Sequence, residues 1–306
     1  MSTRIISAAV ALVIAIVAVA LHATVLLNLL VGALAAVAVY EMLKAVGYNK
    51  YKHQMIACVS FAAVDSLIPY FMYRLGTLYF VSYRLYLGIF ILAMCILFLR
   101  DHKKFSFEEF FGMCGITVLM SYSFGTMIKM VQDDSLMQKL GVPSKYFGKT
   151  QVFLIVASLA AAWLADSGAY FTGTFFKKSG REVHHPWPEI SPNKTLEGLL
   201  GGVVTNGIIL VVTSLVFDLV NDGIKVNYIV MLLAGMVSAV IGLVGDLTAS
   251  MIKRQTDIKD YGNIMPGHGG VMDRFDSALL VVPFMYYLAS QGWLFTGAEA
   301  LSDIIF

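Results

Sequence analysis

Long apolar segments separated by short polar ones dominate the chain. A membrane-spanning helix needs about 20 mostly apolar residues, and nine segments approach that length, at roughly 5–21, 24–44, 55–73, 77–99, 109–130, 152–176, 196–220, 228–252 and 277–296. No internal repeat, linker or shift of composition separates these segments into groups. The pattern predicts an all-α, polytopic integral membrane protein in which residues 1–306 form a single membrane domain. Residues 1–150 would supply N-terminal helices, and 151–306 the helices and loops that carry the chemistry.

Composition narrows the class of protein further. The chain is 58% hydrophobic and only 14% charged, a balance outside the range of ordinary soluble domains. A formal net charge of +2, without a basic run that includes aromatic residues, excludes nucleic acid as an expected partner. Cys58, Cys95 and Cys114 lie in apolar runs without metal-binding spacing, so we expect buried free thiols.

The first apolar run, Ile5 to Leu21, has two interpretations. Arg4 precedes it and Ala18-Val19-Ala20 resembles a cleavage site, as in a secretory signal peptide. However, the run is long for a signal peptide and a second apolar segment follows at once. These features favour a retained first helix.

Basic residues are distributed unevenly between the two sides that nine spans would create. The N-terminus and the loops after the second, fourth, sixth and eighth spans carry 15 of the 22 Lys and Arg residues. Cytoplasmic loops are enriched in Lys and Arg, so this side is predicted to face the cytoplasm of a bacterial-type plasma membrane. The 177–195 and 253–276 loops then share the cytoplasmic side, whereas the 131–151 loop lies outside and has no expected catalytic role.

The stretch from Ser250 to Ser277 concentrates charge between two apolar segments. It contains a titratable His268 and eight charged residues of interest, namely Lys253, Arg254, Lys259, Arg274, Asp257, Asp260, Asp273 and Asp276. Paired carboxylates are oxygen ligands for a hard cation such as Mg²⁺, and neighbouring cations suit phosphate oxygens. The composition therefore predicts a site for phosphate and metal.

The preceding helix supports this interpretation over that of a solvated loop. Asp246, Ser250, Lys253 and Arg254 are spaced so that they share one helix face. A charge such as that of Asp246, inside an apolar helix, costs on the order of 3 kcal/mol on insertion scales. A loop needed only for solubility would not require it.

These residues resemble the signature of the phosphatidate cytidylyltransferases, also called CDP-diacylglycerol synthases. The matching positions are Ser250, Lys253, Arg254, Lys259, Asp260, Gly262, Pro266, Gly267, His268, Gly269, Gly270, Asp273, Arg274 and Asp276. Met265 is a mild departure, since the family usually has Leu, Ile or Phe there, and Met fills a Leu site at small cost. Many fixed polar positions make this pattern far more specific than a lone glycine motif.

Two further stretches are similar to the family. The first is D-S-G-A-Y, which begins at Asp166 within an apolar segment; a carboxylate there points to function, although a structural hydrogen-bond network is the alternative. The second is I-S-P-N-K-T-L-E-G, where Ser191, Asn193 or Thr195 can cap a helix starting near Leu196. Whether Glu197 touches the site is left open. Small residues in both stretches permit close helix packing, namely Gly168, Ala169, Gly173, Gly198 and Gly202.

The resemblance implies attack of phosphatidate on the α-phosphorus of CTP, which yields CDP-diacylglycerol and pyrophosphate. Such a nucleotidyltransferase needs in-line positioning and neutralisation of phosphate charge. We expect Asp246, Asp273 and Asp276 to hold Mg²⁺, with Asp166 or Asp260 assisting or holding a second cation. Lys253, Arg254, Lys259 and Arg274 would grip the phosphates. The expected substrate cradle is completed by Ser191, Lys194, Ser250, Gly267, Gly269 and Gly270.

His268 is expected to position a phosphate, since phosphatidate is already anionic near neutral pH and needs no general base. CTP, phosphatidate and the lipid bilayer are the expected partners. The oligomeric state stays open, with a homodimer among the alternatives. In the N-terminal segments, Asp65 is interpreted as an internal polar contact, and Glu41 as forming an ion pair with Lys44 at a helix end.

Three other functions stay open. A CTP-dependent lipid kinase would also present acidic and basic loops to a lipid alcohol, but the complete P-G-H-G-G-x-x-D-R-x-D stretch argues against it. An ion transporter would explain the intramembrane Asp166 and Asp246, yet no inverted repeat is evident. A catalytically inactive scaffold would be expected to have lost signature residues, and none is missing.

Overall fold

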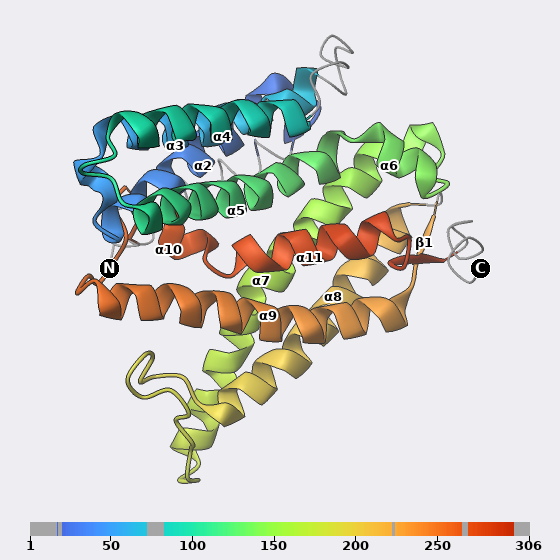
Figure 1. The fold of residues 1–306 in the computed structure, drawn as a ribbon. Coiled ribbons are helices and arrows are strands. Elements are labelled where there is room, and N and C mark those ends of the chain that lie inside the picture. Colours follow the sequence, from blue (N-terminus) through green and yellow to red (C-terminus); the bar gives the residue numbers. More distant parts are fainter. Residues whose placement is uncertain (1–16, 18–19, 72–82, 222–223, 265–268, 297–306) are drawn as a thin grey trace, which may run out of the picture. The chain divides into compact units, whose positions relative to one another are not determined.

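The computed structural model describes residue 17 and residues 20–71, 83–221, 224–264 and 269–296 (Figure 1). Its helices form two compact units, each described here by itself. The first comprises Met1–Gln132 with Gln255–Phe275, and the second comprises Asp133–Arg254 with Asp276–Phe306. In this division the glycine-rich signature stretch groups with the N-terminal helices, and the single membrane domain with parts 1–150 and 151–306 stays a prediction.

The first unit is built from α2 (Val25–Ala45), η1 (Tyr48–Lys50), α3 (Lys52–Asp65), α4 (Tyr83–Arg100), α5 (Phe107–Gln132) and the short α10 (Met272–Phe275). Helix α2 packs against α3, α5 and α10. Helix α5 begins with a capping box, in which Ser106 Oγ accepts from the Glu109 amide at 3.2 Å and Glu109 Oε2 accepts from the Ser106 amide at 2.9 Å. Tyr51 donates to the same carboxylate oxygen at 2.6 Å, which ties the start of α5 to the start of α3.

A turn interrupts one predicted span in this unit. The segment 55–73 was expected to be continuous, but α3 ends at Asp65, a turn covers Ser66 and Leu67, and helical structure resumes over residues 68–71; residues 72 and 73 lie outside the described residues. Ser66 Oγ donates to the Asn28 carbonyl at 2.8 Å, and Asn28 Nδ2 donates back to the Ser66 carbonyl at 2.6 Å. These exchanges with α2 satisfy backbone and side-chain groups at the turn, so the helix can be interrupted there.

The second unit contains α6 (Asp134–Lys139), η3 (Ser144–Tyr146), α7 (Phe147–Lys178), α8 (Leu196–Val220), α9 (Tyr228–Gln255) and α11 (Ala278–Ser290). Small residues bring α7 and α8 close together, as expected. A Cβ added to Gly198 would lie 2.8 Å from the Ala169 carbonyl oxygen, and one added to Gly202 would lie 2.8 Å from that of Ala165. The backbones therefore meet where Gly removes the side chain.

Helix α8 also has a clear apolar outer face. Every fourth residue along it is a large apolar side chain more than half exposed, namely Leu200, Val204, Ile208, Val212 and Val216. A continuous exposed apolar stripe of this length is what a lipid-facing helix presents.

The last predicted span is shorter than expected. It was placed at 277–296, but α11 ends at Ser290, and Gly292, with φ +75°, then turns the chain. Strand β2 (Phe295–Thr296) pairs antiparallel with β1 (Lys225–Val226), which precedes α9. The fold is thus all-α apart from this two-stranded ribbon.

Residues of the 131–151 loop stabilise helix ends in the second unit. Asp133 caps α6 by accepting from the amides of Ser135 and Leu136. Lys139 Nζ donates to the Ser290 carbonyl at 3.1 Å and Lys149 Nζ to the Val220 carbonyl at 3.0 Å. Cations at these helix C-termini satisfy carbonyls that lack intrahelical partners.

Within the described residues, five helical segments are long and apolar enough to cross a membrane. They are Val25–Ala45, Phe107–Gln132, Ser144–Lys178, Leu196–Val220 and Tyr228–Gln255. The predicted span at 5–21 lies almost wholly outside the described residues, as do residues 77–82 of the predicted span at 77–99. A polytopic membrane protein is confirmed, and the count of nine spans stays a prediction.

Candidate functional site

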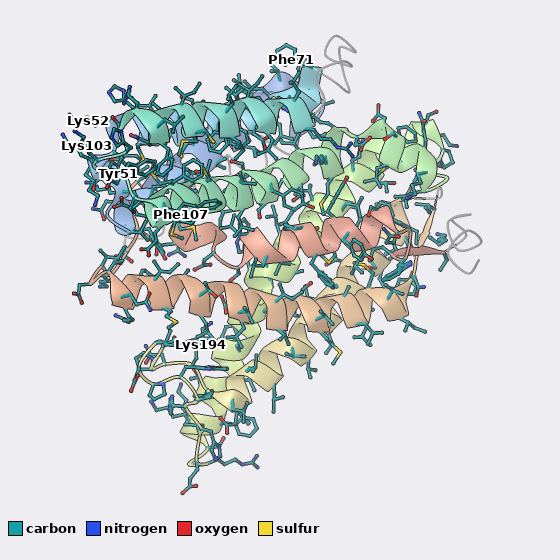
Figure 2. The ribbon with its side chains drawn as sticks, viewed as in Figure 1. Tyr51, Lys52, Phe71, Lys103, Phe107 and Lys194 are labelled. Carbon is teal, nitrogen blue, oxygen red and sulfur yellow. The ribbon has the colours of Figure 1, made fainter. Side chains whose placement is uncertain are left out.

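A lysine lies between two carboxylates in the second unit. Lys194 lies in the loop before α8 (Figure 2). It forms an ion pair with Asp246 of α9, and its Nζ is 3.9 Å from Asp166 Oδ1 of α7. The Lys194 and Asp246 side chains are 22% and 21% exposed, so their charges are partly withdrawn from water. The three charged residues predicted from separate motifs therefore meet in one place.

Asp276 lies next to this cluster. The α9 backbone approaches it closely, since a Cβ added to Gly245 would be 2.6 Å from the Asp276 carbonyl oxygen. Burial raises the pKa of Asp276 to about 7, and the nearby Asp246 carboxylate adds to the rise, while Lys253 opposes it. Asp246 and Asp276 are thus neighbouring carboxylates that are both partly withdrawn from water.

The polar face predicted on α9 is present. Ser250 Oγ donates to Asp246 Oδ1 at 3.3 Å, one turn away. Arg254 Nε donates to the Ile190 carbonyl at 3.4 Å and so joins the end of α9 to the loop that carries Lys194. Ser191 is partly exposed in that loop, and its carbonyl accepts from the Lys194 amide at 3.3 Å.

The N-terminus of α8 is capped by Thr195, whose Oγ accepts from the Gly198 amide at 3.1 Å. Of the three expected candidates, Thr195 is therefore the cap. Glu197 does not reach the acidic cluster by a hydrogen bond of its own; it accepts from His184 Nδ1 at 2.7 Å and from the His184 amide at 3.1 Å. This pair fastens the start of the 179–195 loop to α8, and hydrogen bonding to Glu197 raises the pKa of His184.

The signature stretch of the first unit is organised by Asp273. Its Oδ2 accepts from the Tyr261 amide at 2.8 Å and from the Gly270 amide at 3.0 Å, so it joins the two ends of the 261–270 loop. Gly269, with φ +83°, adopts a left-handed conformation that favours glycine, and a Cβ there would lie 2.8 Å from Asp273 Oδ2. In this structure the carboxylate expected to bind metal closes a loop.

Glu41 was interpreted wrongly from the sequence. It was expected to form an ion pair with Lys44 at the end of a helix, yet it is only 3% exposed. Its Oε2 accepts from the Met272 amide at 2.9 Å, so it contacts the signature stretch directly. The available signal was a lone acidic residue within an apolar segment, the same signal that identified Asp166 and Asp246.

The remaining predicted residues are only partly described. Lys259, Asp260 and Arg274 are exposed in the first unit. Gly267 and His268 lie outside the described residues. Within the described part of the chain, no three carboxylate, thiol or imidazole groups meet as a metal site. Asp246 is paired with Lys194, and Asp273 Oδ2 with backbone amides, so the expected set Asp166, Asp246, Asp273 and Asp276 stays a prediction.

The donor chemistry nevertheless fits a hard cation. Asp166, Asp246 and Asp276 offer only oxygen ligands, as Mg²⁺ prefers. The raised pKa of Asp276 results mainly from burial, and the nearby Asp246 carboxylate adds to it. A divalent cation bound there would favour the ionised form of both carboxylates.

Comparison with known proteins places these features in context. Residues 2–291 match the model of the cytidylyltransferase family. A phosphatidate cytidylyltransferase of Bacillus subtilis is 46% identical over 142 residues, which are 46% of this chain and 48% of the relative. Phosphatidate cytidylyltransferases of Staphylococcus haemolyticus and Staphylococcus aureus are 37% and 35% identical over 155 residues, 50% of this chain and 56% of each relative. The matched segment spans about half the length of these relatives.

Proposed function

Because the chain belongs to the cytidylyltransferase family, we propose that it transfers CMP from CTP to phosphatidate, giving CDP-diacylglycerol and pyrophosphate. The names of its relatives and the complete signature support this reaction. The single structural observation that supports it is a cluster of four charged residues. Asp166 lies in α7, Lys194 in the loop before α8, Asp246 in α9 and Asp276 just before α11. Charged groups from four separate elements converge among apolar helices, where each is costly unless used.

In the proposed reaction a phosphate oxygen of phosphatidate forms a bond to the α-phosphorus of CTP. The bond from that phosphorus to the bridging oxygen of the β-phosphate breaks, and pyrophosphate leaves with the electron pair. No proton must be removed from an already anionic nucleophile. The chain's task is to align the two phosphates and to neutralise their charge.

The residues divide this task among them. Lys194 and Lys253, which lie near the acidic cluster, and Arg254 would hold phosphate oxygens, and Ser191 and Ser250 would add hydroxyl donors. From the signature stretch, Lys259, Arg274 and His268 would contact the remaining phosphates, with the backbone of Gly267, Gly269 and Gly270 allowing close approach.

Asp246 and Asp276 would hold Mg²⁺ together with Asp166, and Asp273 and Asp260 are the further proposed ligands, including for a second cation. When bound, Mg²⁺ would neutralise the triphosphate and polarise its oxygens. Lys194 would be free to shift from Asp246 to a phosphate once the carboxylate has a metal partner. Loss of Mg²⁺ to a chelator is therefore expected to abolish the reaction.

The proposed setting is the cytoplasmic face of the membrane. CTP would enter from water, while the diacyl tails of phosphatidate would stay in the bilayer. A homodimer is compatible with this arrangement, and the proposal does not require one.

The test uses purified protein in detergent with Mg²⁺, phosphatidate and CTP labelled separately at the α- and γ-phosphates. We expect the α-label to enter the lipid as a CDP-linked product while pyrophosphate is released. Asp273→Asn and Asp276→Asn are expected to be inactive. Lys194→Met should lose on the order of 10²-fold in kcat/KM, because a charge-assisted contact of about 3 kcal/mol is removed.

Lys177→Met is the matched control, since Lys177 is an exposed lysine in the last turn of α7. Its activity should equal that of the unaltered protein. Transfer of the γ-label to a lipid alcohol would replace the proposal with a lipid kinase. If neither label moves with freshly prepared membranes, the transport function gains support instead.

A further inference from the structure

A buried carboxylate of α2 supports the signature stretch from 231 positions away in the sequence. Glu41 is 3% exposed, and its Oε2 accepts from the Met272 amide at 2.9 Å. Glu41 therefore holds the backbone immediately before Asp273 and Arg274, within the first unit.

Two signature glycines leave room for this carboxylate. A Cβ added to Gly262 or to Gly270 would collide with the carboxylate of Glu41. Neither glycine adopts the left-handed conformation, so the space that they leave explains them better than backbone freedom. Gly262 of the K-D-x-G stretch and Gly270 of the G-G pair thus form a socket, that is, the space that the Glu41 carboxylate occupies.

Asp273 completes the arrangement from the other side. It joins Tyr261 to Gly270 through their amides, while Glu41 lies against Gly262, Gly270 and Met272. The two ends of the loop are held by two carboxylates from different helices. Removing either should release the segment between Lys259 and Arg274.

We propose that Glu41 is a positioning residue that sets the place of the signature loop for cytidylyl transfer. The effect on cytidylyl transfer rests on the proposed function, whereas the contact between Glu41 and the loop backbone rests on the structure. Glu41 acts through the backbone of residues 270–272 and needs no contact with substrate. Its loss should therefore lower kcat more than it weakens binding of phosphatidate.

The first experiment measures hydrogen exchange of the protein without substrate. In Glu41→Gln and Glu41→Ala, the Met272 amide should exchange on the order of tenfold faster, since it loses a charged acceptor. Gln54→Ala is the matched control, because it also removes a buried polar group. The Gln54 side chain belongs to α3, and its Nε2 donates to Asp101 Oδ2 at 2.8 Å instead of contacting the signature loop. It should leave exchange of the Met272 amide unchanged.

The second experiment is a double-mutant cycle with Gly262→Ala. Alone, this change should lower the melting temperature and the activity, because the new methyl group meets the carboxylate. In the Glu41→Ala background the collision is removed, so Gly262→Ala should have little further effect. Equal effects of Gly262→Ala in both backgrounds would overturn the proposed socket.

The third readout separates positioning from general stability. Glu41→Gln, which keeps the shape of the side chain, should reduce kcat on the order of 10²-fold, as expected for a misplaced catalytic segment. The KM for phosphatidate should stay within about threefold, because a positioning residue is not used in ground-state binding. Unchanged kcat, or unchanged exchange of the Met272 amide, contradicts the inference.

Failure of the proposed function gives a different result. In that case the unaltered protein forms no CDP-linked lipid, while exchange and the Gly262 cycle still report whether Glu41 holds the loop. The two proposals can therefore fail separately.

Discussion

Charged residues within the apolar helices each have a defined environment. Asp246 pairs with Lys194, and Glu41 receives the amide of Met272. Such groups are costly when unpaired, so their presence among membrane helices indicates use. The same rule, applied to the sequence, selected Asp166 and Asp246 as candidate site residues, and both lie near Lys194. It was not applied to Glu41, whose position near a helix end suggested a surface ion pair.

The His184–Glu197 pair makes the 179–195 loop sensitive to pH. Because the pKa of His184 is raised above 6.5 in the folded protein, the pair stabilises the loop fully below pH 6.5. This contribution is lost as the pH rises through the raised pKa. Hydrogen exchange of the His184 amide, corrected for its intrinsic rate, should accelerate across that window.

Glu197→Gln supplies the control for this prediction. The amide side chain keeps its size but cannot raise the His184 pKa as a carboxylate does. Exchange of the His184 amide should then be faster at low pH than in the unaltered protein. Its corrected rate should no longer change as the pH rises through the raised pKa of His184. A pH step of the same size in both proteins would show that another group titrates.

At the level of elements, the α7–α8 contact places Asp166 relative to the rest of the second unit. Gly198 and Gly202 lie against the carbonyls of Ala169 and Ala165, within a turn of Asp166. Because these neighbours are backbone atoms, they cannot rotate away from an added side chain. The close approach of the two helices is therefore a requirement for the site.

Gly202→Ala tests this requirement. The added methyl group would lie 2.8 Å from the Ala165 carbonyl oxygen, and the overpacking should cost on the order of 1–3 kcal/mol of stability. Activity should fall with it, because Asp166 is displaced. Thermal unfolding in detergent measures the first effect and the CTP assay the second.

Gly115→Ala is the matched control in α5. A Cβ there meets nothing within 4 Å, and replacing a helical glycine by alanine stabilises by about 0.5–1 kcal/mol. Its melting temperature should stay the same or rise. If Gly202→Ala behaves like Gly115→Ala, the helices are not as close as described.

At the scale of the whole molecule, the distribution of Lys and Arg predicts which face carries the site. The loop with Ser179 should be cytoplasmic and the loop with Ser144 external; both serines are exposed. In a variant lacking Cys58, Cys95 and Cys114, Ser144→Cys should react with a membrane-impermeant maleimide in intact cells. Ser179→Cys should react only after permeabilisation. The opposite pattern would invert the topology and place the proposed CTP site outside.

The ends of a helix could be predicted from the sequence wherever they coincide with the ends of an apolar run. The predicted segment 196–220 coincides with α8 (Leu196–Val220), and 24–44 nearly coincides with α2 (Val25–Ala45). The prediction at 55–73 missed the turn at residues 66–67, and the prediction at 277–296 was wrong at its C-terminal end. The turn depends on hydrogen bonds with Asn28, and the end of α11 on strand pairing with Lys225, which are contacts with distant segments.

The sequence by itself determined the membrane class, most helix positions and the residue types of the site. These follow from local properties: the length of an apolar run, the spacing of residues on one helix face and the fixed polar positions of a motif. Only the tertiary structure decided which groups are partners, namely Lys194 with Asp246, His184 with Glu197, and Glu41 with the signature loop. Which groups become partners depends on how closely segments that are distant in the sequence approach each other in the fold. The spacing of residues along the chain does not give that distance.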